Sequence, residues 1–205
     1  MDLDTFARWP GILAIAALMA VTGGAASADE ARRVRGTISG MEGDTLSVKT
    51  REGETVDITL AEGWKVNGVA AASLSDIDEG DFVGIASLPN ADGSDGALEV
   101  LIFPAERVGS AGASFPWDLQ PGSTMTNATV ADKVEGVDGN SVSVTYEGGQ
   151  KDISISEGTP IVTFAEATPA DLVAGATVFV PAEMAGGALS TKTVVVGKNG
   201  VVPPM

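Results

Sequence analysis

Alternating hydrophobicity on both sides of a short break is the feature that most constrains the fold of this chain. In residues 43–60, GDTLSVKTREGETVDITL, apolar side chains occupy every second position from Leu46 to Val48 before the break and from Val56 to Leu60 after it. A period of two predicts a strand with one buried face, and two such runs around a glycine-containing break predict a β-hairpin. The chain is therefore expected to be built from β-hairpins.

The hairpin pattern returns in the second half of the chain, in residues 139–156, GNSVSVTYEGGQKDISIS. Further along, Gly175 corresponds to Gly80 and Gly187 corresponds to Gly96, in the same order. Two copies of one hairpin, each followed by matching glycines, indicate two copies of one unit. We interpret each unit as three strands, a short helix and two strands.

This order of elements predicts the fold class. A five-stranded Greek-key barrel of the OB type is closed by Greek-key connections, and its helix lies between the third and fourth strands. We therefore predict an all-β chain of two tandem five-stranded OB-like barrels, each with a short helix between strands 3 and 4 and each closing around its own apolar residues. The first helix is expected within Ala70–Ile77. A small SH3-like barrel is the alternative. The predicted boundaries are 1–28 for a signal peptide, 32–104 and 127–198 for the barrels, 105–126 for a linker and 199–205 for a tail.

The beginning of the chain resembles an export signal. Arg8 precedes the apolar run 11–21, and Ala26-Ser27-Ala28 fits the A-x-A pattern of a cleavage site. The apolar run is too short to cross a bilayer, which needs roughly 20 residues. We expect a Sec-type signal with cleavage after Ala28, a periplasmic or secreted mature protein, and no transmembrane span after cleavage. An uncleaved N-terminal anchor is the alternative.

The charge and the missing residue types exclude several classes of function. The formal net charge is −16, and the chain has no Cys and no His. Nucleic-acid affinity rests mainly on Lys and Arg that neutralise phosphates, and the main basic cluster here is Arg32, Arg33 and Arg35, so we expect no nucleic-acid binding. The lack of Cys rules out thiolate catalysis, and the lack of His removes the usual general base near neutral pH. Cations or a basic protein patch are the compatible partners.

Motifs for catalysis or cofactor binding are also missing from the sequence. It has no phosphate-binding loop and no G-x-G-x-x-G after a strand. The turn 90–96 begins like an EF-hand loop, but its sixth position is Asp95 in place of Gly and its twelfth is Leu101 in place of Glu. The acids between Asp76 and Asp81 flank a turn, where charged residues usually face water. We expect no enzyme, no cofactor and no metal site; a carboxylate-only hydrolase is the alternative.

Three segments of the first unit, the GDTLSVKT hairpin, SLSDIDEGDFVGI and the strand GALEVLIF, resemble the bacterial DUF5666 domain family. The second half, from PWDLQPGSTMTNATV through TPIVTFAEA to KNGVVPPM, looks like the long two-unit proteobacterial members of that family. The resemblance covers nearly all of the expected mature chain. It implies an exported, OB-like protein. Because the family has no established activity, it implies no chemistry.

The segment between the two units holds most of the candidate contact residues. Phe115, Trp117 and Leu119 lie in a linker rich in Gly, Ser and Pro. Exposing a bulky apolar side chain costs roughly 1.5–3 kcal/mol. The segment therefore either packs between the barrels or presents a contact site. Phe115, Trp117 and Asp118, together with the distant Trp64, form the predicted partner-binding set.

These observations together predict a binding function. We expect an exported, non-catalytic binding or adaptor protein whose partner is an envelope protein or a small ligand. The alternative is a weak divalent-cation-binding or envelope-stress accessory protein associated with metal transport. Such a protein would not itself be a permease, because one short apolar run cannot form the several membrane spans that a permease requires.

Overall fold

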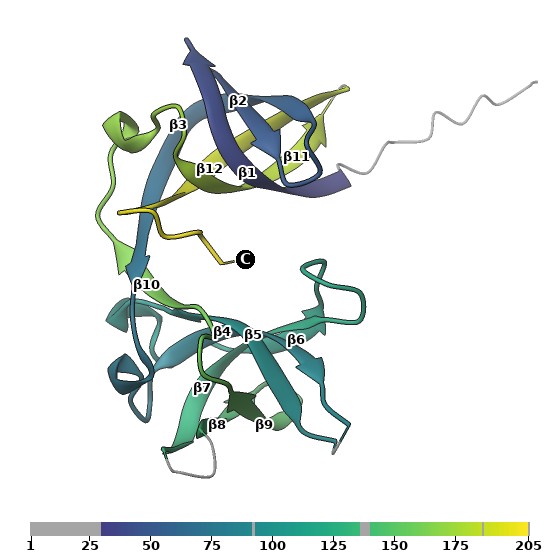
Figure 1. Cartoon of the computed structure of the whole chain (residues 1–205), viewed down its shortest axis with the longest axis vertical. Coiled ribbons are helices and arrows are strands. Elements are labelled where there is room, and N and C mark those ends of the chain that lie inside the picture. Colours follow the sequence, from purple (N-terminus) through teal and green to yellow (C-terminus); the bar gives the residue numbers. More distant parts are fainter. Residues whose placement is uncertain (1–29, 92, 136–139, 186, 205) are drawn as a thin grey trace, which may run out of the picture.

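The described part of the chain is all-β. The computed structural model describes residues 30–91, 93–135, 140–185 and 187–204, so the predicted signal peptide, 1–28, lies outside the described residues. Every regular element in these ranges is a β-strand or a single turn of 3-10 helix, which confirms the predicted all-β class. Figure 1 shows the strands gathered into two bodies, one above the other, with the last described residues running between them.

Five strands close into a barrel in the upper half of Figure 1. They are β1 (Glu30–Glu42), β2 (Thr45–Thr50), β3 (Thr55–Ala71), β11 (Thr177–Ala185) and β12 (Ala188–Gly197). Hydrogen bonding runs in the order β12-β11-β1-β2-β3 between antiparallel neighbours. The ring closes where β12 pairs with β3 in parallel, with Val195 opposite Asn67.

The strands of the lower body follow the same order of pairing. They are β4 (Phe82–Pro89), β5 (Asp95–Ile102), β7 (Thr124–Val134), β8 (Asn140–Tyr146) and β9 (Gly149–Ile155). Antiparallel pairing runs β5-β4-β7-β8-β9. A short parallel pairing of β5 with β9, with Asp95 opposite Ile153, closes this ring as well.

A short strand joins the two barrels into one continuous sheet. The remaining elements are the strands β6 (Ala113–Pro116) and β10 (Ile161–Ala165) and the 3-10 turns η1 (Leu74–Asp76), η2 (Ala105–Arg107) and η3 (Pro169–Asp171). β10 pairs antiparallel with the end of β3, where Phe164 lies opposite Val69. It also pairs in parallel with β5, where Ile161 lies opposite Val100. β6 pairs with β7 at the side of the lower barrel.

Each barrel takes two of its strands from the other half of the chain. β4 and β5 follow β3 in sequence, yet they pair with β7 and β9 in the lower barrel, while β11 and β12 pair with β1 and β3 in the upper barrel. The two exchanges correspond. Thr37 and Thr129 occupy equivalent positions in the two sequence units, as do Phe82 and Thr177. Thr37 lies opposite Thr177 in the upper barrel, and Thr129 lies opposite Phe82 in the lower barrel. This pairing corrects the expectation of two tandem barrels that each close around their own apolar residues.

The length of β3 explains the exchange. At about 3.3 Å per residue, its 17 residues extend through the upper barrel and on to the contact with β10. Figure 1 shows β3 descending from the upper body toward the lower one. The chain that leaves β3 therefore enters the lower barrel. The predicted boundaries 32–104 and 127–198 accordingly mark units of the sequence and not separate barrels.

The short helix predicted between the third and fourth strands of the first unit does not form. β3 occupies the beginning of Ala70–Ile77, and the 3-10 turn η1 follows it. The carboxylate of Asp76 accepts hydrogen bonds from the backbone N–H and the hydroxyl of Ser73, both at 2.7 Å, which completes the turn without further helical residues. Ile77 is fully buried in the lower core, so the chain turns inward at once.

Apolar residues from both halves of the chain fill each barrel. Leu46 and Val142 occupy corresponding hairpin positions, and they are buried in the upper and the lower core respectively. A third cluster joins side chains from both barrels and packs the two bodies against each other. Its buried members are Val69, Leu101, Val162, Phe179 and Val195.

The strand exchange can be tested with engineered cysteines, because the chain has none. Ala31 and Glu183 are direct partners on β1 and β11, and opposite residues of antiparallel strands lie within the Cα separation that a disulfide spans. We expect the double variant Ala31→Cys/Glu183→Cys to form an intramolecular disulfide on mild oxidation. Thiol titration and migration on a non-reducing gel would measure it.

The matched control is the double variant Ala31→Cys/Leu88→Cys. Leu88 is the counterpart of Glu183 in the first sequence unit, and it would pair with Ala31 if each unit closed its own barrel. We expect this control to stay reduced. A disulfide in the control, together with free thiols in the test variant, would contradict the exchange.

Candidate functional site

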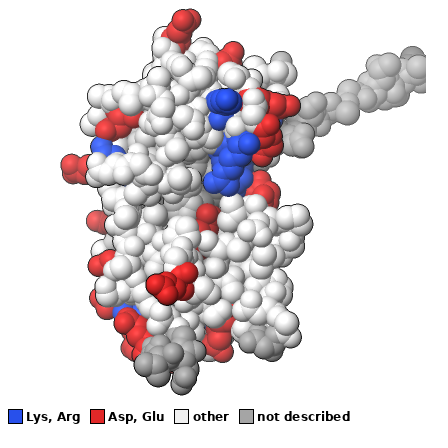
Figure 2. Space-filling view, viewed as in Figure 1, with Lys and Arg blue, Asp and Glu red and all other residues white. Residues whose placement is uncertain are grey.

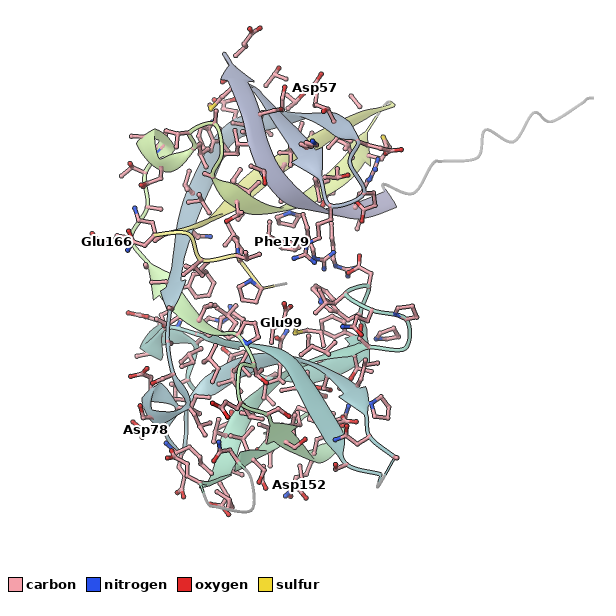
Figure 3. The ribbon with its side chains drawn as sticks, viewed as in Figure 1. Asp57, Asp78, Glu99, Asp152, Glu166 and Phe179 are labelled. Atoms are coloured by element: carbon pink, nitrogen blue, oxygen red, sulfur yellow. The ribbon has the colours of Figure 1, made fainter. Side chains whose placement is uncertain are left out.

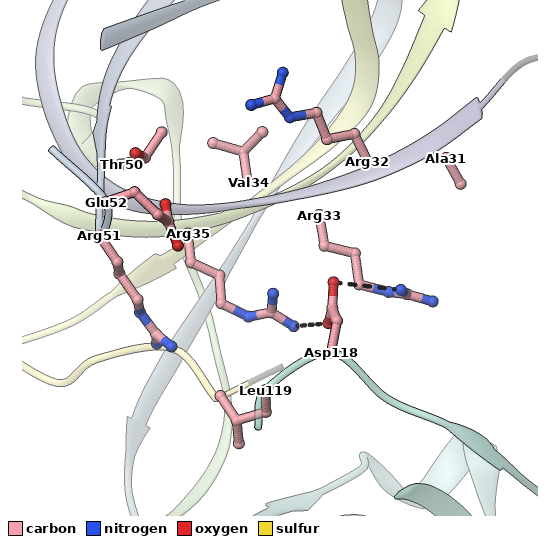
Figure 4. Close-up of a pocket in the computed structure, with 10 residues that line it drawn as sticks. All are labelled: Ala31, Arg32, Arg33, Val34, Arg35, Thr50, Arg51, Glu52, Asp118 and Leu119. Carbon is pink, nitrogen blue, oxygen red and sulfur yellow. Dashed lines mark hydrogen bonds and ion pairs between the residues drawn. The ribbon is translucent and has the colours of Figure 1, made fainter. Parts of the chain in front are cut away.

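A hollow lined by arginines lies beside β1 of the upper barrel (Figure 4). Its volume is about 380 Å³, and its lining joins β1, the turn between β2 and β3, and the linker between β6 and β7. We call it the arginine hollow. Its charged lining residues are Arg32, Arg33, Arg35, Arg51, Glu52 and Asp118.

The alternation of β1 directs Arg33 and Arg35 to one side of the strand. Val34 between them is buried in the upper core, so both neighbours point away from that core. The turn after β2 adds Arg51, whose backbone N–H donates to the carbonyl of Arg35 at 3.1 Å. In Figure 4 these three arginines lie on the same side of β1, whereas Arg32 points to the opposite side.

Asp118 in the linker anchors two of these arginines. Nη2 of Arg35 donates to Oδ1 of Asp118 at 2.8 Å, and Nη1 of Arg33 lies 3.5 Å from Oδ2. Burial alone would raise the pKa of Asp118, but the Arg35 hydrogen bond and the charges of both arginines outweigh it, so the pKa lies below its ordinary value of 3.8. The ionised carboxylate therefore ties the linker to the upper barrel at neutral pH.

The indole ring of Trp117 forms a wall beside these charges. The guanidinium carbon of Arg33 lies 4.1 Å from the ring centroid, and the ring of Phe115 packs edge-on against the indole at a centroid distance of 5.9 Å. A guanidinium within about 6 Å of a tryptophan ring is attracted by the ring quadrupole. Arg33 is therefore held between an aromatic ring and a carboxylate, which fixes the direction of its guanidinium.

The arginine hollow is a local positive site on an acidic chain of net charge −16. Figure 2 shows acidic side chains scattered over the visible face, with the broadest basic area on the right of its upper half. Arg32 and Arg51 make no ion pair with any described residue, although the carboxylate of Glu52 lines the hollow next to Arg51. Arginine forks fit carboxylate and phosphate groups in bidentate geometry. The hollow therefore has the chemistry to bind an oxyanion.

A second pocket uses the same linker and is largely apolar. Its volume is about 110 Å³, and we call it the aromatic pocket. Nε1 of Trp117 is buried and has no hydrogen-bond partner among the described residues, and a buried donor left unpaired costs about 1–3 kcal/mol. Glu99 also lines the pocket, and Figure 3 shows it between the barrels, on the side facing Phe179. The apolar lining residues are Leu101, Phe103, Phe115, Trp117, Met125 and Pro204.

The structure brings three of the four predicted contact residues together. Phe115 and Trp117 line the aromatic pocket, and Asp118 lines the arginine hollow. Trp64 does not join them, because its side chain packs against the core of the upper barrel. The linker segment packs against the upper barrel through Asp118 and also lines two openings, while its role as a contact site stays a prediction.

Sequence reasoning missed the contribution of Arg51 to the site. The arginines of β1 are visible as a cluster in the sequence, but Arg51 is separated from them by a complete hairpin strand. Pairing of Gly36 with Thr50 places the next residue, Arg51, beside Arg35. The sequence signal that could have predicted the position of Arg51 is the pairing register of β1 with β2, counted from the hairpin turn at Gly43. A bulge between Ile38 and Gly40 shifts that register by one residue.

The acidic residues of the described ranges do not gather into a metal site. No group of three or more His, Cys, Asp or Glu side chains in these ranges could hold a metal ion. Asp171, for example, pairs with Lys198 at 2.6 Å. This contact, with the backbone N–H of Thr168, holds the pKa of Asp171 below its ordinary value of 3.8. In the same ranges, no helix has the length and apolar character that crossing a membrane requires.

The anchoring role of Asp118 predicts a pH-dependent effect on stability. Because the folded-state pKa is depressed, the Asp118 carboxylate stabilises the fold above its ordinary pKa of 3.8, and this contribution is lost as the pH falls through the folded-state value. We expect Asp118→Asn to lower the free energy of unfolding by up to about 1 kcal/mol at pH 7, the usual size for a partly exposed ion pair. Denaturant titrations at pH 7, 5 and 3 would measure the difference.

The control for this experiment is Glu62→Gln, which removes an exposed carboxylate that makes no ion pair with a described residue. We expect no measurable change in unfolding free energy for this variant. A difference between Asp118→Asn and the wild type that stays the same at pH 3 would show that the effect is not due to the charge.

The chain matches no protein-family model. Comparison with curated proteins and with solved structures finds no match either. Its function must therefore be inferred from the chemistry of the site.

Proposed function

We propose that this protein is a non-catalytic binding protein that captures an oxyanion, carboxylate or phosphate, in the arginine hollow. The observation that carries the proposal is the convergence of Arg33, Arg35 and Arg51 on one side of β1, where Asp118 holds two of them in place. The oxyanion belongs to an envelope protein or to a small ligand. The protein thus acts as an adaptor that recognises an acidic group.

The net negative charge of the chain does not prevent this recognition. At physiological ionic strength, charges are screened over about 8 Å. The affinity for an oxyanion inside the hollow is therefore determined by the guanidinium groups that contact it. The distant acidic residues mainly slow the approach of the oxyanion. Arg51 makes no ion pair with a described residue, so its fork is available to the ligand.

Binding without catalysis is supported by the residue types in the hollow. Its carboxylates are Glu52 and Asp118, and Asp118 is committed to hydrogen bonding with Arg35. The depressed pKa of Asp118 keeps this group ionised, so it carries no proton that it could donate near neutral pH. The sequence also has no His to serve as a base and no Cys to serve as a nucleophile.

The proposal includes the fold type and the location. Both barrels have the neighbour order and the parallel closing pair expected of OB-type barrels, which supports an OB-like assignment for each. Export to the periplasm or beyond rests on the pattern of residues 1–28, and membership of the DUF5666 family rests on the sequence resemblance. The cation-binding alternative stays a prediction that no cluster in the described ranges favours.

Anion titration followed by proton–nitrogen NMR tests the proposed function. We expect inorganic phosphate and acetate to perturb the signals of β1 and of the β2–β3 turn in a saturable manner, with weaker binding at high salt. Arg51→Gln should weaken phosphate binding by about tenfold or more, because a hydrogen bond to a charged group contributes roughly 1.5–3 kcal/mol. Arg51→Lys should recover only part of this loss, since an ammonium lacks the planar fork.

The matched control is Lys65→Gln, which removes one exposed positive charge from β3 of the same barrel. We expect it to leave the affinity for phosphate within about twofold of the wild type. Equal losses in Arg51→Gln and Lys65→Gln would mean that only general charge matters. The absence of saturable binding for both anions would refute the proposed function.

A further inference from the structure

We infer that the oxyanion recognised in the arginine hollow carries a short apolar chain, which enters the aromatic pocket. The preferred ligand is then an amphipathic carboxylate, and not a bare inorganic anion. This inference rests on the proposed function and goes beyond it, because it names the chemistry of the rest of the ligand. It is carried by the relation between two pockets that use one linker segment.

The linker places the two pockets next to each other along the chain. Asp118 and Leu119 line the arginine hollow, while Phe115 and Trp117 line the aromatic pocket. The guanidinium of Arg33 lies 4.1 Å from the centroid of the Trp117 ring. A charged group bound by Arg33 would therefore lie close to the ring that forms a wall of the aromatic pocket.

The buried N–H of Trp117 is an independent observation that points to a ligand. Nε1 is buried and lacks an acceptor among the described residues, and buried polar groups in folded proteins are nearly always paired. A ligand oxygen would supply the missing acceptor. The indole N–H and the guanidinium of Arg33 then provide two donors on or near one ring, which suits the two oxygens of a carboxylate.

The linings of the two openings fix the direction of the ligand. The arginine hollow offers guanidinium groups, whereas most of the side chains that line the aromatic pocket are apolar. The charged end of the ligand is therefore expected on the arginine side of Trp117, and the uncharged chain is expected to point toward Leu101 and Met125.

The size of the aromatic pocket limits the length of the apolar chain. Its volume is about 110 Å³, whereas an apolar cavity of about 150 Å³ holds benzene, with its six carbons. At the same volume per carbon atom, about four carbon atoms fit into the aromatic pocket. Pro204 of the C-terminal segment lines the same pocket, so a longer chain would have to displace that segment.

A series of straight-chain carboxylates tests the inference on the full chain. Acetate, propionate, butyrate, pentanoate and octanoate would be titrated while the indole N–H resonance of Trp117 is followed by NMR. We expect affinity to rise about fourfold for each added methylene, the gain from burying one methylene. The rise should end near pentanoate, and the Trp117 indole signal should shift for every member that binds.

Two variants distinguish the contribution of the aromatic pocket to the affinity from that of the arginine hollow. Phe115→Ala opens the wall of the aromatic pocket, and we expect it to remove most of the gain per methylene. Arg51→Gln should lower the affinity for every carboxylate by the same factor and leave the gain per methylene unchanged. The unfolding midpoint of each variant would verify that it is folded.

The outcomes distinguish this inference from the proposed function. If acetate binds in the hollow but affinity does not change with chain length, the amphipathic ligand is refuted and the proposed function stands. If affinity keeps rising to octanoate and is insensitive to Phe115→Ala, the chain adsorbs elsewhere and the inference is also refuted. If neither carboxylate nor phosphate binds, the proposed function fails, and the inference fails with it.

Discussion

Both barrels depend on the uninterrupted strand β3. It pairs with β2 and β12 in the upper barrel and with β10 at the boundary, where the lower barrel begins. The crossing is close, because a Cβ at Gly68 would lie 2.8 Å from the carbonyl oxygen of Ala165 and 3.1 Å from the Cβ of Ala167. Only glycine allows such an approach without displacing the neighbouring backbone. This contact fixes how the two bodies meet, and the apolar cluster of both barrels packs around it.

The alternating pattern of the sequence predicted which side chains are buried, but it could not predict which strands pair. Leu46 and Val142 are both core residues, as their positions in the two hairpins indicate. Corresponding strands of the two units present similar apolar faces, however, so β4 and β11 suit either barrel by pattern alone. The choice depends on the path of the chain after β3. The short helix was mispredicted because Ser73 and Asp76 complete a turn within a few residues.

The site was predictable only where its residues stand out locally. Phe115 and Trp117 are conspicuous as bulky residues in a linker, and Asp118 lies beside them. Arg51 was not predictable in this way, because it reaches Arg35 only through the bulged pairing of β1 with β2. The hydrogen bond between Arg35 and Asp118 joins residues 83 positions apart and connects the upper barrel to the linker that leads into β7 of the lower one. The arginine hollow therefore exists only in the assembled molecule.

The exchange of strands also determines how the molecule can come apart. The linker after β5 is exposed at Val108, and a single cleavage there would divide the chain into two fragments. The first fragment would hold three strands of the upper barrel and two of the lower, and the second would hold the complement. Neither fragment contains all five strands of a barrel, so the two fragments stay associated after the cleavage. In the uncut chain the two barrels differ in this respect, because the strands of the lower barrel follow one another from β4 to β9, whereas those of the upper barrel lie before and after this stretch.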